Sequence, residues 1–256
     1  MNLSRANPIS WMEWLGALAS KSQSTKIKSV AELDLAITKC RKCPRLVEWR
    51  EEVARTKRKS YQDQEYWGKP VPGFGESKPK LLIVGLAPGA HGANRTGRIF
   101  TGDSSGDWLF GSLHRIGVAK IPTSTAINDG QKLRGARIAC AVRCAPPDNK
   151  PSNEERDTCS GWFQTELTLT LPTVRSFVVL GKFAFDALVK NLKLHGHQVP
   201  KHTFGHGVEI KYEHKGVKYL IVCSYHPSQQ NTFTGKLTKP MLDAALKKGA
   251  RFAGIV

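Results

Sequence analysis

Four short apolar runs recur along the chain and predict the strands of a buried sheet. The runs span residues 81–86, 138–142, 177–180 and 219–224. Val and Ile are frequent in them, as is typical of parallel strands that are covered on both faces. Segments with helical apolar spacing lie near residues 105–117, 153–169, 182–192 and 240–252. Strands that alternate with helices in this way predict an α/β fold built on a parallel sheet.

The remaining segments divide the chain into an extension and one domain. Residues 1–30 end in a polar, basic stretch, and we interpret them as an N-terminal extension. Residues 31–60 are expected to be helical, with an interruption at Cys40-Arg41-Lys42-Cys43-Pro44, and the Gly- and Pro-rich residues 61–79 are expected to be irregular. Residues 204–212 are expected to add a short strand near the last one. Residues 31–256 are therefore predicted to form one α/β domain.

Polar motifs follow each apolar run at its carboxyl end. The longest is the loop of residues 85–107, which contains six glycines and leads into a predicted helix. Shorter motifs occupy residues 143–150, 181–182 and 225–231. In open parallel sheets, ligands bind outside the carboxyl ends of the strands. The sequence therefore predicts that these loops meet at one functional crevice.

The charge of the chain points to a polyanionic partner. Lys and Arg number 39 and Asp and Glu number 21, which gives a formal net charge of +18. This surplus favours nucleic acid over a basic surface that only faces water or a membrane. No apolar run approaches the about 20 residues of a membrane span, and the first 24 residues lack the pattern of a signal peptide. We therefore expect a cytoplasmic protein that does not enter a membrane.

Four of the six cysteines have the spacing of a metal centre. Cys40 and Cys43 form a C-x-x-C motif, while Cys144 and Cys159 flank a Pro-rich loop. Four thiolates suit either tetrahedral zinc or an iron–sulfur cluster, and the spacing alone does not separate these alternatives. Cys223 lies in a buried run and is expected to act as a small hydrophobic side chain.

Several motifs in order resemble the iron–sulfur uracil-DNA glycosylases, specifically family 5 (UDGb). The motifs that carry the resemblance are Cys40 and Cys43 with their neighbours, Trp67–Gly75, Gly85–Gly89, Ala90–Asp103, Arg143–Asn149 and His226–Gly235. The resemblance covers residues 33–246. It implies a three-layer α/β/α sandwich with a central four-stranded parallel sheet. It also implies a [4Fe-4S] cluster on Cys40, Cys43, Cys144 and Cys159, held in a cluster-binding segment.

The activity that the resemblance implies is DNA repair. A monomer would flip uracil, and other deaminated bases such as hypoxanthine, out of double- or single-stranded DNA. It would then hydrolyse the N-glycosidic bond and leave an abasic site. A non-catalytic iron–sulfur module that only binds lesions is the competing interpretation. A nucleotide phosphohydrolase is disfavoured, because the loop of residues 85–107 contains no lysine and no G-x-x-x-x-G-K-[ST] motif.

Four residues are candidates for the chemistry. Phe100 would stack on the flipped base. Asp103 would orient or deprotonate the attacking water, although an Asp at this position could also cap the following helix. Asn149 would hold the water or the base, unless it is only a turn residue after Pro146-Pro147-Asp148. His226 would donate a hydrogen bond to the O2 atom of the base as negative charge develops there.

The wall of the base pocket follows from the same resemblance. Its members would be Gly85, Ala87, Gly89, His91, Phe100 and Cys140. Ala87 stands where other uracil-DNA glycosylase families often carry an acidic residue. Cys140 stands where they carry an asparagine that reads uracil. Both differences are typical of family 5, and the missing asparagine predicts a broader range of bases.

The DNA contacts are expected on two segments. The loop of residues 231–236 resembles the one that enters the duplex at the lesion, with Asn231 and Thr232 in the groove or in the space that the flipped base leaves. Phosphate contacts are expected from Arg95, Arg98, Lys150, Lys236 and Lys239.

Overall fold

A six-stranded sheet lies at the centre of the computed structural model, which describes residues 27–256. The strand order is β1-β3-β2-β4-β6-β5. The strands are β1 (Phe74–Gly75), β2 (Leu81–Gly85), β3 (Ala136–Cys140), β4 (Ser176–Leu180), β5 (Glu209–His214) and β6 (Val217–Ser224). Of the predicted extension, residues 1–26 lie outside the described residues, and a helix already begins at Val30.

The four inner strands are parallel to one another, as predicted, and an antiparallel strand is added at each edge. β3, β2, β4 and β6 pair in parallel. The edge strands β1 and β5 pair antiparallel with β3 and β6. The prediction of a four-stranded sheet therefore describes its parallel centre. The strand expected at 204–212 begins later, at Glu209, and forms a hairpin with β6.

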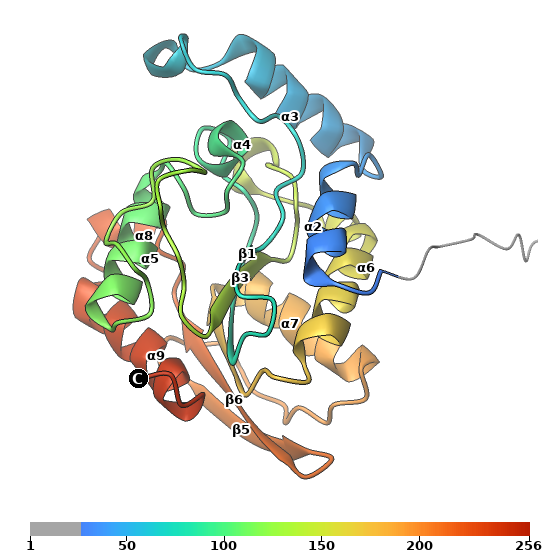
Figure 1. The fold of residues 1–256 in the computed structure, drawn as a ribbon, viewed down its shortest axis with the longest axis vertical. Coiled ribbons are helices and arrows are strands. Elements are labelled where there is room, and N and C mark those ends of the chain that lie inside the picture. Colours follow the sequence, from blue (N-terminus) through green and yellow to red (C-terminus); the bar gives the residue numbers. More distant parts are fainter. Residues whose placement is uncertain (1–26) are drawn as a thin grey trace, which may run out of the picture.

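Helices cover both faces of the sheet and give three layers (Figure 1). The helices are α2 (Val30–Thr38), α3 (Pro44–Thr56), α4 (Ala93–Thr96), α5 (Ser104–Arg115), α6 (Asn153–Thr170), α7 (Lys182–Leu194), α8 (Gln229–Phe233) and α9 (Lys239–Phe252). Leu81 and Ile83 of β2 belong to the core that includes α5 and α9, whereas Leu82 and Val84 belong to the core that includes α6 and α7. This alternation is what a strand buried on both faces requires. Within the described residues, no helix is long and apolar enough to cross a membrane.

The parallel strands end at the same edge of the sheet. Gly85 at the end of β2 is opposite Cys140 of β3, and Leu180 of β4 is opposite Ser224 of β6. The loops that follow these four residues therefore start side by side. This register brings together the polar motifs that the sequence places after each strand.

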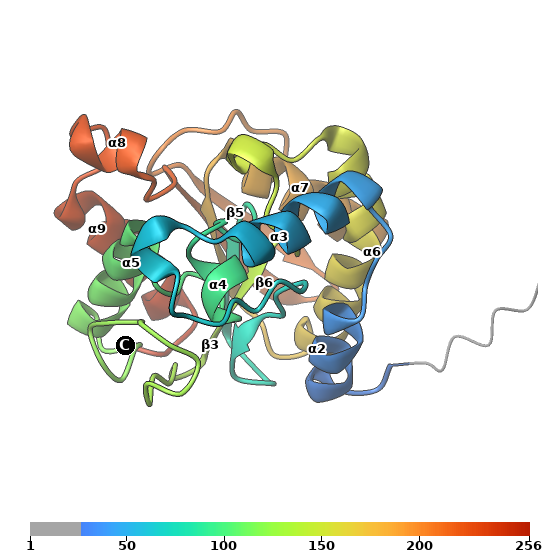
Figure 2. The ribbon, with the colours of Figure 1, turned by 90° about the horizontal axis from the view of Figure 1, so that it is seen from above.

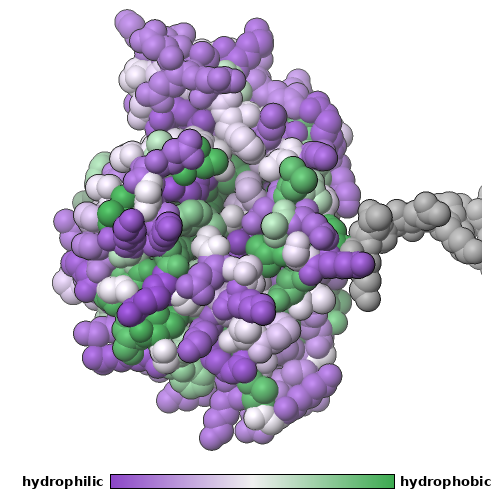
Figure 3. Space-filling view, viewed as in Figure 1, coloured by the Kyte–Doolittle hydropathy of each residue, from purple (hydrophilic) through white to green (hydrophobic). Residues whose placement is uncertain are grey.

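Helices α2 and α3 lie beside this edge, as seen from above in Figure 2. α2 packs against α6, and the surface over α3 is almost entirely hydrophilic (Figure 3). A buried ion-pair network fixes α2 and α6 to β3. Arg137 of β3 donates to Asp34 of α2 at 2.5 Å and to Glu166 of α6 at 2.6 Å, and Glu166 also accepts from Arg143. Buried charges of this kind are tolerated only when each has close partners.

Candidate active site

Asp103 sits at the start of α5, where its two carboxylate oxygens have different surroundings. Oδ1 accepts a hydrogen bond from the backbone N–H of Gly106 at 2.9 Å, so Asp103 is the N-cap of α5. Oδ2 faces the turn of residues 89–92. A Cβ atom on Gly92 would lie 1.9 Å from Oδ2, and one on Gly89 would lie 2.9 Å from it. The glycines of this turn therefore make room for the second oxygen, and the expected capping role exists beside any role in catalysis.

Burial raises the pKa of the Asp103 carboxyl, and the nearby Asp107 adds to this effect. The hydrogen bond from Gly106 and the positive charge of Arg95 act in the opposite direction. A carboxylate whose pKa is raised accepts a proton more readily than an ordinary Asp. Perturbed carboxyl groups in loops of this type are candidates for functional groups.

Phe100 lies in the loop after β2 and His226 in the loop after β6, and their rings lie against each other. Their ring centroids are 5.8 Å apart, and the ring planes are inclined by 31°. Phe100 is buried and has a positive φ of 51°, a conformation that costs a non-glycine residue energy. A Cβ atom on Gly85 would lie 2.7 Å from the Phe100 ring and 3.0 Å from the Cys140 sulfur. Gly85, Phe100 and Cys140 are thus neighbours, and glycine at position 85 lets the ring approach the strand.

His226 is neutral at physiological pH because burial lowers its pKa to about 4. Its backbone carbonyl accepts a hydrogen bond of 2.9 Å from the side-chain amide of Asn231, which ties the strand end to α8. A neutral imidazole still carries one N–H group. His226 can therefore act as a hydrogen-bond donor without adding a positive charge to the site.

The comparison with known proteins agrees with this arrangement. The family model described as "Uracil DNA glycosylase superfamily" matches residues 72–248. The chain belongs to this superfamily. It is 50% identical to the "Type-5 uracil-DNA glycosylase" of Mycobacterium leprae over 227 residues, which are 89% of this chain and 97% of that protein. It is 47% identical to the protein of the same description from Thermus thermophilus, over 86% of this chain and 96% of that protein.

A "Type-4 uracil-DNA glycosylase" of Pyrobaculum aerophilum is 30% identical over 72% of this chain and 81% of its own length. The similarity to this type-4 protein is lower than the similarity to the two type-5 proteins. The family resemblance that the motifs indicate is confirmed, and it is strongest with the type-5 group.

Asn149 is exposed on the surface of the protein, in a short 3-10 helix that spans Pro147–Asn149. Both Asp148 and Asn149 have a positive φ, of 53° and 55°, which Asn and Asp adopt more easily than other side chains. The turn that we considered for Asn149 is therefore present. Its contact with water or base stays a prediction.

His91 has a partner that the sequence did not reveal. The buried Tyr66 places its hydroxyl 3.1 Å from Nδ1 of His91. Burial lowers the pKa of His91, and the positive charges of Arg58 and Arg95 lower it further. Tyr66 precedes the Trp67-Gly68-Lys69-Pro70 stretch of the family motif, and this position is the only signal for it in the sequence.

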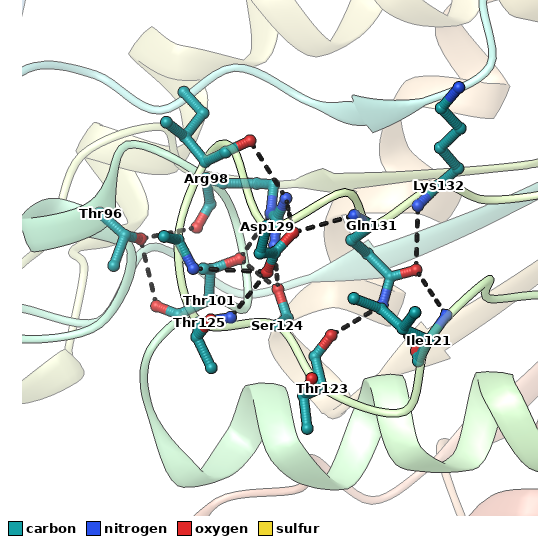
Figure 4. Close-up of polar contacts among 12 residues, drawn as sticks. Thr96, Arg98, Thr101, Ile121, Thr123, Ser124, Thr125, Asp129, Gln131 and Lys132 are labelled. Atoms are coloured by element: carbon teal, nitrogen blue, oxygen red, sulfur yellow. Dashed lines mark hydrogen bonds and ion pairs between the residues drawn. The ribbon is translucent and has the colours of Figure 1, made fainter.

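Arg98 is not placed to contact phosphate, which corrects its assignment to the DNA-binding residues. Its guanidinium is buried and pairs with Asp129 at 2.5 Å, with further bonds to Ser124 at 2.8 Å and Thr101 at 2.9 Å (Figure 4). Asp129 also accepts backbone N–H bonds at Thr125 and Gln131. Arg98 therefore holds the segment of residues 123–131 against the long loop.

Arg95 is also engaged within the protein, although it is only half-buried. It donates to the carbonyl groups of His91 and Gly102, at 2.8 Å each, and to the side chain of Gln64. Its guanidinium stacks over the ring of Tyr61 at 4.0 Å. These contacts fix the loop in front of Asp103. A phosphate contact by Arg95 stays a prediction and would require sharing these bonds.

The segment expected to enter DNA forms the short helix α8 and the turn after it. Asn231 bonds back to His226, and the hydroxyl of Thr232 bonds to the carbonyl of Ser228 at 3.1 Å, so both side chains stabilise the segment. Phe233 is 79% exposed, which is unusual for an aromatic side chain, and no pattern in the sequence indicates this exposure. Lys236 is exposed and lies 4.9 Å from the ring of Tyr225.

The four predicted metal-ligand cysteines line one cavity. Cys40, Cys43, Cys144 and Cys159 share it with Arg50, Arg143 and Trp162. Among the described residues, no three His, Cys, Asp or Glu side chains form a compact group around one metal ion. Ala87, which we expected in the base pocket, packs against the buried cluster of Leu46, Val142, Cys144 and Cys159. The loop that leads to Asp103 thus touches the cysteine group near its start.

Two features of the cavity fit a sulfur-rich anionic group. Arg50 donates to the Cys144 sulfur at 2.9 Å, and Trp162 donates to the Cys40 sulfur at 3.2 Å. In addition, Nε of Arg50 and both Nε and Nη1 of Arg143 are buried without a partner among the described residues. Buried N–H groups without acceptors are rare in native proteins.

Proposed function

We propose that this chain is a uracil-DNA glycosylase, which hydrolyses the N-glycosidic bond of uracil in DNA and leaves an abasic site. The observation that carries the proposal is the contact between Phe100 and His226 at the carboxyl edge of the sheet, with Asp103 three residues after Phe100 on the same loop. The target nucleotide must leave the base stack, because its glycosidic bond is inaccessible within it. The ring of Phe100 offers a stacking surface for the flipped base.

The chemical step requires a base for water and a donor for the leaving group. The Oδ2 atom of Asp103 orients the water, and its carboxylate takes up the proton that the water loses as oxygen bonds to the sugar C1′. The C1′–N1 bond breaks, and its electron pair leaves with the uracil. The neutral His226 donates a hydrogen bond to O2 of the base, where the negative charge develops. The imidazole packs beside the Phe100 ring, so the donor lies next to the surface on which the base would stack.

The range of bases extends beyond uracil in this proposal. The buried Cys140 lies beside Gly85 and Phe100 and offers a thiol where an amide would read the edge of uracil. Without a matching donor and acceptor pair, the pocket has less means to reject hypoxanthine or another deaminated base. Double- and single-stranded DNA that contain such bases are the substrates, and phosphate contacts from Lys236 and Lys239 are expected to supply affinity.

We further propose that Cys40, Cys43, Cys144 and Cys159 hold a [4Fe-4S] cluster. The unpartnered N–H groups of Arg50 and Arg143 and the N–H to sulfur bonds support this choice of cofactor. The cluster would supply a structural cross-link and no redox chemistry for base removal. Its ligands come from the α2–α3 connection, from the loop after β3 and from α6, so the cysteines connect three parts of the fold.

An alkali cleavage assay tests the activity. The protein is incubated in excess with a duplex that contains one uracil, and abasic sites are converted to strand breaks. We expect breaks at the uracil and none in the matched thymine duplex. Binding of the uracil duplex without breaks at saturating protein would instead identify a non-catalytic lesion-binding module. Duplexes with hypoxanthine in place of uracil test the broader range separately.

A further inference from the structure

Two arginines of this chain line the cavity of the four cysteines and come from different elements of the fold. Arg50 lies on α3, which follows Cys43, and Arg143 directly precedes Cys144 after β3. Both side chains are only 2% exposed. A buried guanidinium is expensive unless its charge and its N–H groups find partners.

The protein supplies only part of the partners that these arginines require. Arg50 donates to the carbonyl of Cys40 at 3.2 Å through both Nη atoms and to the Cys144 sulfur at 2.9 Å. Arg143 donates through Nη2 to Glu166. Arg50 Nε, Arg143 Nε and Arg143 Nη1 have no acceptor among the described residues. Each unpaired buried N–H costs about 1–3 kcal/mol.

The geometry points to the cluster as the missing partner, and this inference rests on the proposed [4Fe-4S] site. We propose that Arg50, Arg143 and Trp162 form a hydrogen-bonding shell around the cluster. Their N–H groups bond to its cysteine sulfurs, as Arg50 and Trp162 already do with Cys144 and Cys40, and to its inorganic sulfides. A cluster held by four thiolates is an anion, so two guanidinium groups also compensate its charge.

The network described above keeps Arg143, one member of this shell, in place. Arg143 is fixed by Glu166, which Arg137 holds from β3, and Arg137 is held in turn by Asp34 of α2. Arg143 is therefore anchored through β3, α2 and α6, and α6 also carries Cys159. Partners of metal ligands orient those ligands and tune the metal, and their loss typically weakens metal binding about 10- to 100-fold.

The shell would also shift the reduction potential of the cluster. Hydrogen bonds to sulfur and nearby positive charge stabilise the more reduced form and raise the reduction potential. Loss of Arg50 should therefore lower the potential of the 3+/2+ couple and make the cluster easier to oxidise and lose. These arginines are positioning residues, because they act on the cofactor and not on the DNA base.

The test compares the purified wild-type protein with Arg50→Met, Arg143→Met and Trp162→Phe. Arg55→Met is the matched control, because Arg55 lies on the same helix α3 and is exposed. Iron and sulfide content, the rate of loss of the visible absorbance in air with a chelator, and the midpoint potential by voltammetry are measured. We expect Arg50→Met and Arg143→Met to lose the cluster about 10-fold faster or more, with a lower potential. Arg50→Lys should restore part of both properties, and Arg55→Met should match the wild type.

The outcomes separate this inference from the proposal that it rests on. A wild-type protein that contains no iron and sulfide would refute the cluster itself. A wild-type protein with a full cluster, together with arginine variants of unchanged potential and lifetime, would refute the shell. If either arginine variant does not fold, Trp162→Phe decides, because it removes one N–H donor and keeps an aromatic ring; unchanged values there overturn the proposal.

Discussion

The ring of Phe100 lies 5.8 Å from the ring of His226, although Phe100 belongs to the loop after β2 and His226 to the loop after β6. The parallel register brings these loops to one edge, and the glycine at position 85 lets the Phe100 ring approach β2 and β3. A base stacked on Phe100 would therefore meet the imidazole of His226 beside it. We expect the two residues to orient the base, and Asp103 is on the same loop as Phe100.

Replacement of Asp103 tests the role of its carboxylate. Asp103→Asn should lower single-turnover cleavage of uracil DNA by about 10²–10⁴-fold, the usual contribution of a general base. Asn is also a good N-cap, so α5 should stay intact. Because the pKa of Asp103 is raised in the folded protein, removal of this charge should not destabilise the fold at neutral pH.

The control for this variant is Asp107→Asn, which changes an exposed carboxylate one turn further along α5. Cleavage should remain near the wild-type rate at neutral pH, because burial, and not the Asp107 charge, is the main cause of the raised Asp103 pKa. Equal losses in both variants, or wild-type cleavage by Asp103→Asn, would contradict the role assigned to Asp103. Thermal unfolding of both variants separates loss of function from loss of structure.

The pH dependence of cleavage should follow Asp103 and not His226. Burial raises the pKa of Asp103, so its reactive carboxylate forms only as the pH rises through that higher value. Burial lowers the pKa of His226 to about 4, so the imidazole stays neutral above that pH. The single-turnover rate should therefore rise with pH, with a midpoint above the ordinary pKa of an Asp. The same rise should persist in His226→Gln; its disappearance in that variant would show that His226 is the group that titrates.

The turn beside Asp103 offers a test that leaves the carboxylate itself unchanged. A Cβ atom in Gly92→Ala would lie 1.9 Å from Oδ2, so the carboxylate must move. We expect a loss of cleavage with little change in DNA binding. Gly161→Ala is the control, because Gly161 lies in α6 with open space around it. That helical substitution should stabilise the protein by about 0.5–1 kcal/mol and leave cleavage unchanged.

Arg98 and Lys236 should respond in opposite ways to the same type of replacement. Arg98→Met breaks a buried ion pair with Asp129 and should lower the free energy of unfolding by about 3–5 kcal/mol. Lys236→Met should leave stability unchanged and weaken binding to DNA of any sequence. The slope of log K for DNA binding against log salt concentration should become shallower by about 0.9, the value for one phosphate contact. A normal salt slope for Lys236→Met would exclude Lys236 from the DNA interface.

The sequence predicted the elements with a strong repeating pattern. The four inner strands and helices α5, α6, α7 and α9 follow from buried apolar runs and helical spacing, and their ends were close to those observed. β1 was missed because two residues carry no periodic signal, and β5 was expected a few residues too early. The helices α4 and α8 are only four and five residues long, and each lies in a loop that was interpreted by its chemistry.

The parts of the candidate site that follow the parallel strands were predictable from the order of strands and loops along the chain. Loops after parallel strands must meet, so Phe100 and His226 could be placed together from the strand pattern and the family motifs. The partners of side chains were not predictable, because they come from distant segments. Nothing near Arg98 in the sequence indicates Asp129, and nothing near Cys144 indicates Arg50. A basic residue in a loop is usually expected to be exposed. Arg98 was therefore predicted to contact DNA phosphate.

The edges of the sheet have a consequence for how the protein behaves at high concentration. β1 has only two residues, and β5 alternates buried residues with the charged Glu209, Lys211 and Glu213. Glu209 is further engaged by Lys248 of α9. Short and charged edge strands discourage pairing with a strand from another molecule. The sheet therefore protects itself against edge-to-edge aggregation, even when the protein is crowded along a DNA molecule.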